Sequence, residues 1–403
     1  MKPIITRFFF TGILLLINFC AVAQKQRVKV VPRKVAFDFG WKFTLGSPLN
    51  AEKANFDDRS WDAVDLPHDW SIAGEIKASN PSGNDGGYFP AGLGWYRKMF
   101  RVPSAYRNKK VTIYFEGVYM NAEVFINGKS LGIRPYGYSS FSYNITPYLD
   151  YNGKNSIAVK VDNAQQKNSR WYSGSGIYRH VWLMVTDQVY IDHWGVAITT
   201  PDVTKDKALV QLTTTVKNES NTIKNLVLNI ALVDSNQVVM GKEQLKVVIA
   251  PNQTKIVTQR IVINNPSLWT PSVPNLYSAR LALTDGNREA DRIVVPFGIR
   301  TINFSADKGF LLNGETVIIN GGCLHHDNGA LGAAAYDRAE IRKVLLMKAA
   351  GFNAVRTSHN PPSEAFLNAC DSLGLLVMDE SFDGWRTKKT DHDYAKYFDQ
   401  WWH

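Results

Sequence analysis

The feature of this sequence that most limits its fold is a regular alternation of apolar strands and helical segments after residue 298. Short apolar strands are expected at residues 316–320, 353–356 and 375–378, and an Asn313-Gly314 turn before the first of them predicts a hairpin. A helical segment separates each of these strands from the next. Because a parallel strand pair needs a crossover connection, this β-α-β-α-β order indicates parallel strands.

The first of the two helices is expected to begin at Asp337 and to end at Gly351. Asp337 and Glu340 have the spacing of a capping box, in which each residue satisfies a free backbone N–H at the helix start. The helical spacing predicts a buried stripe that consists of Ile341, Val344 and Leu345.

The second helix is expected to begin at Asn360-Pro361, a cap residue followed by a proline in the first turn. It should end at Gly374, because glycine readily adopts the left-handed backbone that closes a helix. Its predicted buried side chains are Phe366, Ala369 and Leu373.

The chain before residue 298 has a different pattern, with short alternating strands and almost no helical periodicity. In residues 24–187 the strands 111–115 and 122–126 are clear, and Asn127-Gly128 after the second is a strong hairpin signal. This pattern predicts a β-sandwich.

A second all-β stretch follows at residues 188–297, with strands expected at 209–216 and 226–233. Its size of roughly 110 residues suits an immunoglobulin-like sandwich of two packed sheets. We therefore expect two successive β-sandwiches before the β/α region.

The first 23 residues have the pattern of an export signal. Lys2 and Arg7 flank the start of an apolar run at 8–19, and Ala21-Val22-Ala23 supplies a small-x-small cleavage site. An uncleaved anchor is the alternative, although the apolar run is short for a membrane span. We expect a secreted or periplasmic protein with no membrane segment after signal cleavage.

Cleavage after residue 23 would leave Cys323 and Cys370 as the cysteines of the mature chain. Two cysteines give no disulfide framework of the kind that small secreted domains use. We expect two buried free thiols.

The net charge of +10 does not indicate a nucleic-acid partner. Seven of the positive charges lie in the first 35 residues, which contain no acidic residue, and this leaves +3 for the other 368. The 11 Trp and 17 Tyr are a more unusual feature, since such residues form sugar-stacking surfaces as well as the cores of β-sandwiches.

Polar side chains follow each of the three expected parallel strands, at the edge where a (β/α)8 barrel has its active site. The alternative is ordinary loop solvation, but three clusters in register favour a functional rim. These residues are His325, His326, Asp327, Arg356, His359, Asp379, Glu380 and Asp383.

The residue types at this rim do not identify a reaction by themselves. His325 and His326 are adjacent and should point to opposite sides, and no H-x-H or H-E-x-x-H spacing supports a zinc site. A phosphate-binding glycine loop and a G-x-S-x-G nucleophile elbow are also missing from the sequence. Asp379 and Glu380 are neighbours at a strand end, so they are poorly arranged as a general acid and nucleophile.

Several segments together resemble family 2 of the glycoside hydrolases, the β-galactosidase family. The most specific is Arg356-Thr357-Ser358-His359-Asn360-Pro361, followed by residues 374–380, which is similar to the family's first signature. Segments similar to the family's N-terminal sugar-binding sandwich are 56–61, 66–70, 94–97 and 169–179. Residues 265–269 and 274–277 resemble its immunoglobulin-like domain, and 297–300 resemble the start of its barrel.

The resemblance covers essentially the whole mature chain and implies a multi-domain fold. A signal peptide at 1–23 precedes an all-β jelly-roll-like, sugar-binding sandwich at 24–187 and an immunoglobulin-like sandwich at 188–297. Residues 298–403 correspond to the truncated N-terminal part of a TIM, or (β/α)8, barrel, with about three β/α units.

The resemblance also implies hydrolysis of terminal β-glycosidic bonds, β-galactoside-like, with retention of configuration. A nucleophilic Glu and an acid/base Glu, roughly 5–5.5 Å apart, carry out that reaction. In the family both follow the segment similar to residues 397–402, so we expect both beyond His403. We therefore expect the chain alone to be inactive and prone to aggregate.

Three rim residues match family positions that bind the sugar or support the nucleophile, and a fourth is a weaker candidate. His325 and His359 match sugar-binding histidines, and Asp327 is a weaker candidate for a sugar hydroxyl. Arg356 matches an arginine that faces the nucleophile and would keep its carboxylate ionised.

At two positions the sequence departs from the family pattern. Arg170 stands where several relatives have an Asp that reaches into the site, which leaves the choice of sugar open. Gly384 replaces the Glu that binds magnesium in the best-known β-galactosidases, so we expect no metal and no cofactor. Asp383 and Trp385 could serve the sugar pocket instead, by hydrogen bonding and stacking, with core packing as the alternative for Trp385.

The expected partner is an oligosaccharide or polysaccharide with a terminal β-linked sugar. Within the family, a β-galactoside is favoured over a β-glucuronide or β-mannoside, and oligomerisation stays open. The competing interpretation is a non-catalytic carbohydrate-binding protein of two β-sandwiches with a vestigial barrel.

Overall fold

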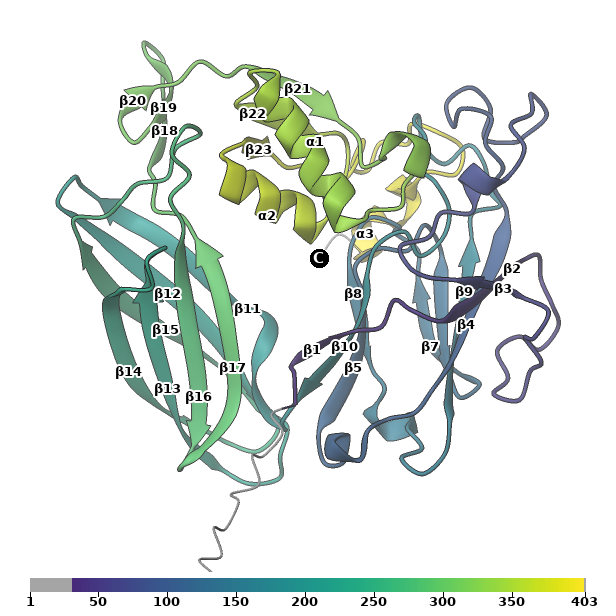
Figure 1. Ribbon diagram of the computed structural model, residues 1–403, viewed down its shortest axis with the longest axis horizontal. Coiled ribbons are helices and arrows are strands. Elements are labelled where there is room, and N and C mark those ends of the chain that lie inside the picture. The colour runs from purple at the N-terminus through teal and green to yellow at the C-terminus, as the bar shows by residue number, and fades with distance from the viewer. Residues whose placement is uncertain (1–30, 402–403) are drawn as a thin grey trace, which may run out of the picture. The chain divides into compact units, whose positions relative to one another are not determined.

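The computed structural model describes residues 31–401 and contains six β-sheets and a few helices (Figure 1). The expected leader at residues 1–23 lies outside the described residues. Among residues 31–401, no helix has the length and apolar character needed to cross a membrane.

Two antiparallel sheets form the first sandwich. One has the order β1 (Lys34–Ala36), β10 (Val181–Thr186), β5 (Lys110–Phe115) and β8 (Phe141–Asn144). The other has the order β3 (Asp62–Val64), β2 (Trp41–Leu45), β4 (Leu93–Phe100), β9 (Asn155–Asp162), β6 (Ala122–Ile126) and β7 (Lys129–Arg134). Three single turns of 3-10 helix connect strands: η1 (Ser71–Ala73), η2 (Ser104–Tyr106) and η3 (Thr146–Tyr148).

Side chains alternate between the two faces along the strands of this sandwich, as strand geometry requires. On β5, Val111, Ile113 and Phe115 are fully buried, whereas Thr112 on the opposite face is partly exposed. Asn127 and Gly128 both have positive φ angles, 50° and 84°, and join β6 to β7, so the expected hairpin is confirmed.

The second sandwich also consists of two antiparallel sheets. One sheet has the order β11 (Val189–Val203), β12 (Lys207–Asn218) and β15 (Gln253–Asn264). The other has the order β14 (Val239–Ile249), β13 (Lys224–Val233), β16 (Tyr277–Asp285) and β17 (Arg288–Phe297). Its core is aliphatic and includes Val210, Leu212, Leu228 and Leu283, all fully buried.

Strand β11 has an irregularity near its start. Its pairing with β12 shifts between Ile191 and Val196, so the intervening residues leave the ladder as a bulge. Trp194, inside this bulge, has a φ of 58° and an exposed side chain.

A small antiparallel hairpin sheet precedes the β/α units. It contains β18 (Ile302–Ser305), β19 (Gly309–Leu312) and β20 (Glu315–Thr316). The expected turn at Asn313-Gly314 is confirmed, with φ angles of 54° and 82°.

The expected first parallel strand at 316–320 is wrong, because that strand is β21 (Gly321–Leu324) instead. Asn353 explains the difference: its side chain bonds the backbone of Ile318 and Asn320, which fixes the connection without a strand ladder. A Cβ on Gly321 would lie 2.9 Å from a backbone oxygen of β22 (Ala354–Thr357), so this strand depends on a glycine that apolar periodicity does not detect.

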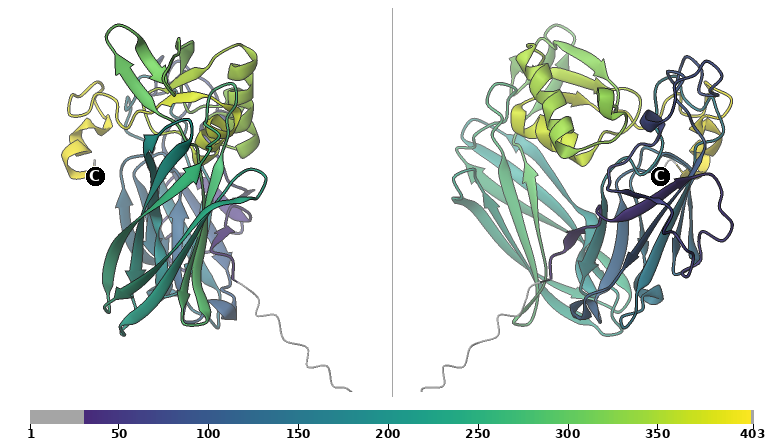
Figure 2. Two further views of the ribbon diagram at one scale, coloured as in Figure 1. Left: turned by 90° about the vertical axis from the view of Figure 1, so that its left-hand side faces the viewer. Right: turned by 45° about the vertical axis from the view of Figure 1, so that its right-hand side comes forward.

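Three parallel strands follow the hairpin in the order β21, β22 and β23 (Leu376–Met378). Helices α1 (Asp337–Ala349) and α2 (Glu364–Leu373) lie side by side on one face of this sheet (Figures 1 and 2). The predicted β-α-β-α-β order with parallel strands is therefore confirmed. The remaining short elements are η4 (Gly329–Leu331), η5 (Tyr394–Tyr397) and α3 (Phe398–Trp401).

Helix α1 differs from its predicted cap and stripe. Tyr336 is its N-cap residue, without a side-chain cap, because Glu340 is buried and instead accepts hydrogen bonds from Asn328 and Ser363. Of the predicted stripe, only Val344 is buried, and Ile341 and Leu345 are exposed. The side of α1 that packs against the neighbouring core includes Val344 and Met347 and is therefore narrower than the predicted stripe.

Helix α2 begins later than the predicted Asn360-Pro361 start, at Glu364 after the cap residue Ser363. The Ser363 hydroxyl accepts a hydrogen bond from the backbone N–H of Phe366, so a serine cap replaces the predicted asparagine cap. The predicted end at Gly374 is confirmed by its left-handed φ of 79°.

The two cysteines of the β/α units differ in their surroundings. Cys370 on α2 is buried, as expected. The expectation that Cys323 is also buried is wrong, because this residue of β21 is exposed on the open side of the parallel sheet.

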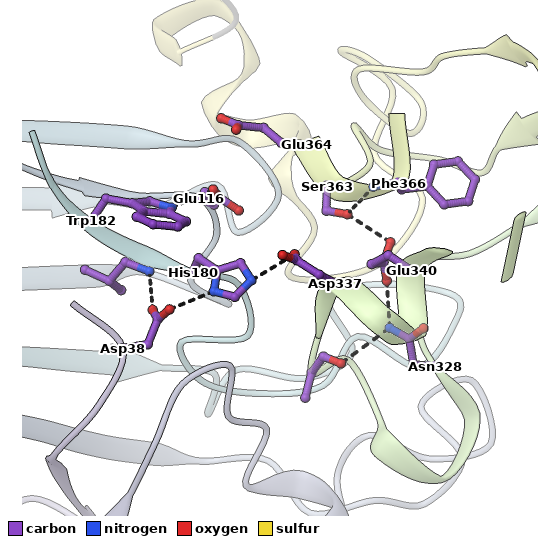
Figure 3. A network of polar contacts seen from close by, with 12 residues as sticks. Asp38, Glu116, His180, Trp182, Asn328, Asp337, Glu340, Ser363, Glu364 and Phe366 are labelled. Atoms are coloured by element: carbon purple, nitrogen blue, oxygen red, sulfur yellow. Dashed lines mark hydrogen bonds and ion pairs between the residues drawn. The ribbon is translucent and has the colours of Figure 1, made fainter. Parts of the chain in front are cut away.

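A seam of polar contacts joins the first sandwich to the β/α units (Figure 3). His180 lies between two carboxylates: its Nδ1 is 2.8 Å from Asp38 of the sandwich and its Nε2 is 3.1 Å from Asp337 of α1. Asp69 makes a second link, because it accepts hydrogen bonds from the backbone of Ala333 and from the Tyr172 hydroxyl. The seam holds loops of the sandwich against the ends of the parallel strands.

Candidate functional site

The candidate site lies at the C-terminal ends of β21, β22 and β23. Each strand delivers a predicted residue there: His325 follows β21, Arg356 belongs to β22, and Asp383 lies in the segment after β23. The loop of the first sandwich around Trp171 lies against these strand ends and forms a further wall. The site thus combines residues from two parts of the chain that are about 150 residues apart.

Glu380 is the centre of a charged cluster at this rim. Its carboxylate accepts a hydrogen bond from Arg356 Nε and lies 2.9 Å from His359 Nδ1. Arg356 Nη2 is itself 3.4 Å from the same nitrogen of His359. Glu380 therefore fixes both predicted residues in one orientation, and its own oxygens are engaged by them.

Three aromatic rings form the wall above this cluster. Trp171 lies 5.2 Å from the ring of His325 and 5.3 Å from the ring of His359, and the two histidine rings are 5.6 Å apart. Burial, followed by the charge of His359, lowers the pKa of His325 and so favours the neutral imidazole. Its Nδ1 is buried and has no hydrogen-bond partner among the described residues.

His326 points away from this wall, as the adjacent position predicts. Its Nε2 lies 3.0 Å from the backbone oxygen of Ser173, and its ring contacts Tyr138 and Tyr178. Burial lowers the pKa of His326 to about 3. This histidine anchors the sandwich loop and does not face the rim.

Arg170 and Asp383, both predicted to bind sugar, bind each other. Arg170 Nη2 lies 2.8 Å from each carboxylate oxygen of Asp383. The pair spans from the first sandwich to the segment after β23, and its charges neutralise one another.

Trp385 and Asp327 lie at the edges of the site. Trp385 is 57% exposed and its ring contacts Phe382 and Phe398 at 6.1 and 5.6 Å, so core packing does not account for it. Asp327 follows His326, and its carboxylate is close enough to His325 to raise the pKa of that ring against the effect of burial.

A pocket opens between the sandwich loop and the rim. Tyr136 is one of its lining residues, and its hydroxyl donates a hydrogen bond to the backbone oxygen of Ser381. The other lining residues include Tyr138, Trp171, His359, Asp383 and Tyr394. Aromatic and polar side chains in such a mixture are typical of a site for a small polar ligand.

The sequence patterns missed Glu380 as a positioning residue, and also Trp171 and Tyr136. The signal for Glu380 was Arg356, since a guanidinium at a strand end requires a carboxylate nearby. The contacts of Trp171 and Tyr136 depend on the packing of the sandwich against the rim, which strand patterns do not specify. Within residues 31–401, no three His, Cys, Asp or Glu side chains gather closely enough to hold a metal ion.

Comparisons with known proteins place this geometry in a family. The family descriptions that match are "Glycosyl hydrolases family 2, sugar binding domain" at residues 40–187, "Glycosyl hydrolases family 2" at 189–300 and "Glycosyl hydrolases family 2, TIM barrel domain" at 305–390. The β-galactosidase BoGH2A of Bacteroides ovatus is 47% identical over 373 residues, which are 92% of this chain and 44% of that protein.

Solved structures show the same architecture. A glycosyl hydrolase family 2 member from Bacteroides cellulosilyticus has a TM-score of 0.89 and 42% identity, with 92% of this chain and 48% of that chain covered. The Bacteroides uniformis β-glucuronidase has a TM-score of 0.80 and 29% identity, with 89% and 43% covered. The chain spans about half the length of the relatives it matches, or somewhat less.

Proposed function

Because the chain belongs to family 2 of the glycosyl hydrolases, we propose that its rim binds the sugar of a β-glycoside that is hydrolysed with retention of configuration. We further propose that this sugar is a neutral, β-galactoside-like unit at the end of an oligosaccharide or polysaccharide. The observation that carries the proposal is the cluster of Trp171, His325 and His359 above the Glu380–Arg356 pair.

The cluster has the chemistry that sugar recognition needs. The imidazole of His325 can exchange a hydrogen bond with a sugar hydroxyl, and the Trp171 face can cover apolar C–H groups. Glu380 holds His359 by Nδ1, which leaves Nε2 for the ligand. The orientation of the His359 imidazole is thus set before the sugar arrives.

The carboxylates at the rim act as positioning or binding groups in this proposal. Glu380 is engaged by Arg356 and His359, Asp379 accepts a hydrogen bond from Thr357, and Asp383 is paired with Arg170. A nucleophile must be free to attack the anomeric carbon, and an acid must hold a proton for the leaving oxygen. The two catalytic glutamates are therefore assigned to sequence outside the described residues, and Arg356 would face the nucleophile.

Electrostatics favours a neutral sugar over a uronic acid. The relatives include both β-galactosidases and β-glucuronidases. A glucuronide carries a carboxylate that needs an uncompensated cation. Arg170 and Arg356 are each paired with an acidic side chain, so only the exposed Lys389 at the edge of the pocket could serve it. A galactoside needs only hydrogen bonds and stacking.

The test uses the product expressed from the natural locus, including any coding sequence after codon 403, beside the 403-residue chain itself. We expect the locus product to hydrolyse an aryl β-galactoside faster than an aryl β-glucuronide, and the 403-residue chain to hydrolyse neither. His359→Phe should lower kcat/KM by about 10²-fold, the usual effect of deleting one transition-state hydrogen bond.

Phe304→Ala is the matched control, because this exposed residue of β18 lies outside the rim, and its kcat/KM should stay unchanged. A preference for the glucuronide would overturn the proposed sugar. No hydrolysis of either glycoside by the locus product would overturn the enzymatic function and leave sugar binding alone.

Export to the periplasm or the medium is proposed from the leader at residues 1–23. Its charged start, apolar run and small-x-small site support this location. Cell fractionation, with N-terminal sequencing of the mature protein, should find a chain that begins near residue 24. A cytosolic protein that retains Met1 would contradict the proposal.

A further inference from the structure

A second cavity lies between the first sandwich and strand β11, with none of its lining residues in the rim pocket. Its volume is about 160 Å³, whereas one water needs roughly 10–15 Å³ by the same measure. The cavity therefore has room for several ordered waters or for one sugar ring.

The floor of this cavity is one face of the sheet formed by β1, β10, β5 and β8. Thr112, Ser142 and Thr186 lie on this face together with the ring of Tyr114. The strand register brings them together, since Tyr114 pairs with Ser142 and the neighbouring strand places Thr186 beside Lys110. The hydroxyls of these two threonines and of Ser142 have no hydrogen-bond partner among the described residues, so they are available to a ligand.

The opposite wall comes from the bulge of β11. The ring of His193 lies 4.5 Å from the ring of Tyr114, and its Nε2 is buried without a hydrogen-bond partner among the described residues. A buried, unpaired nitrogen is costly, and a bound hydroxyl or water would satisfy it.

Trp194 follows His193 in the bulge and lies outside the cavity lining, beside the His193 ring. Its side chain is 67% exposed, and its ring lies 5.0 Å from the ring of His193. The φ of 58° is an uncommon conformation for a bulky residue. Such backbone positions gather at ligand sites, where the surrounding structure maintains them.

The charges that line the cavity are already balanced. Each of its three cationic residues is paired with one carboxylate, which leaves no net charge for an anionic ligand. The pairs are Arg33 with Asp291, Lys110 with Glu219, and Lys217 with Asp192.

We propose that this cavity is a carbohydrate subsite for one ring of an uncharged β-linked oligosaccharide, with Trp194 stacking on the next ring. The hydroxyls of the sheet would replace water around the first ring, and a small turn of the His193 ring would bring its unpaired Nε2 to a sugar hydroxyl. The subsite is separate from the rim and stands whether or not the rim catalyses hydrolysis.

The test measures binding of cellotetraose and β-1,4-galactotetraose by calorimetry and saturation-transfer NMR. It uses the monomeric fraction of the 403-residue chain from size-exclusion chromatography, which removes the aggregates expected of this chain. Trp194→Ala should weaken binding of at least one of them about tenfold, through the loss of one stacking contact. His193→Phe keeps the ring against Tyr114 but removes the nitrogens, and should weaken it several-fold. Circular dichroism confirms that each variant is folded, and the exposed position of Trp194 makes unfolding of its variant unexpected.

Phe304→Ala is the matched control, since it removes an exposed aromatic ring outside both sites and should leave binding unchanged. Trp385→Ala removes an exposed tryptophan at the rim and separates rim binding from binding at this subsite. Absence of binding of both tetrasaccharides at millimolar concentration would overturn the proposal. Binding that survives Trp194→Ala and His193→Phe but disappears in Trp385→Ala would assign all of it to the rim and also overturn the proposal. Preferential binding of tetragalacturonate would show that the ligand class is wrong.

Discussion

Replacing His180 with glutamine should destabilise the protein at pH 6, by an amount that decreases as the pH rises from 7 to 10. His180 bridges Asp38 and Asp337 at the seam, with nitrogen–oxygen distances of 2.8 and 3.1 Å (Figure 3). Glutamine can still donate one hydrogen bond to Asp38 but cannot carry a charge. The variant therefore separates the charge of the bridge from its hydrogen bond.

The direction of the effect follows from the pKa of His180. Burial lowers this pKa, but the hydrogen bond and charge of Asp38, with the charges of Glu116 and Asp337, outweigh burial and raise it from 6.5 to about 9. When a group has a higher pKa in the folded protein than in the unfolded chain, its protonation stabilises the folded state. This stabilisation has its full size at pH values below the unfolded pKa. The contribution should be complete below about pH 6.5 and lost as the pH rises through about 9.

The size of the effect can be worked from the same values. At 1.36 kcal/mol per pKa unit, the rise would give roughly 3 kcal/mol for a fully shielded bridge. The His180 side chain is 17% exposed, but Asp337 is 62% exposed, and solvent screens that half of the bridge. We therefore expect about 2 kcal/mol in the free energy of unfolding at pH 6.

Lys98 titrates in the same range with the opposite sign. Burial lowers its pKa to about 8, so its contribution to stability increases as the pH rises from about 8 toward 10.5. The difference between wild type and His180→Gln removes this background, because Lys98 is present in both.

Urea unfolding at several pH values between 6 and 10 measures this difference. It should be about 2 kcal/mol at pH 6 and shrink to a few tenths near pH 10, since a neutral histidine and a glutamine bind Asp38 alike. His392→Gln is the matched control, and its unfolding curve should follow wild type at each pH. A difference that stays constant with pH, or that grows toward pH 10, would refute the charged bridge.

Further outcomes are expected at other sites. Asp69→Ala leaves three backbone N–H groups and one hydroxyl without an acceptor, and should lower the free energy of unfolding by about 3–5 kcal/mol in urea titrations; a loss under about 1 kcal/mol would contradict this. Glu380→Gln should reduce kcat/KM of the locus product about tenfold or more at an unchanged melting temperature, and equal activity would show that Glu380 does not position the rim. Gly374→Ala, at a φ of 79° with a Cβ 2.3 Å from a backbone oxygen, should cost more than about 1 kcal/mol by thermal unfolding, and an unchanged midpoint would contradict it. Iodoacetamide should modify Cys323 before Cys370, because Cys323 is exposed and hydrogen bonds lower its pKa, whereas burial raises the pKa of Cys370 to about 12. Peptide mass mapping measures the order of modification, and the reverse order would refute this prediction.

The sequence predicted those parts of the fold in which local pattern and tertiary packing agree. Alternation along β12 and β13 and the two Asn-Gly hairpins are of this kind, since each residue's face or turn follows from its own neighbours. Strand β21 could not be placed because a glycine there allows close approach to β22, and glycine adds nothing to an apolar pattern.

The sequence predicted which residues lie at the candidate site, but not which side chains they contact there. The positions of His325, Arg356 and His359 after the strands follow from the β/α order. Their partners come from other segments: Trp171 lies about 150 residues earlier, and Glu380 lies just beyond the end of the neighbouring strand β23. Such contacts depend on how separate elements pack, which one sequence does not reveal.

The wall of the rim that comes from the first sandwich has a consequence for evolution and design. Trp171 and Arg170 belong to a sandwich loop, and His326 and Asp69 fasten that loop to the β/α units through Ser173 and Ala333. A chimaera that receives this sandwich from another family member would inherit a different wall while its strands stay the same. Substrate preference could therefore be transplanted by exchanging a module that carries none of the residues after the parallel strands.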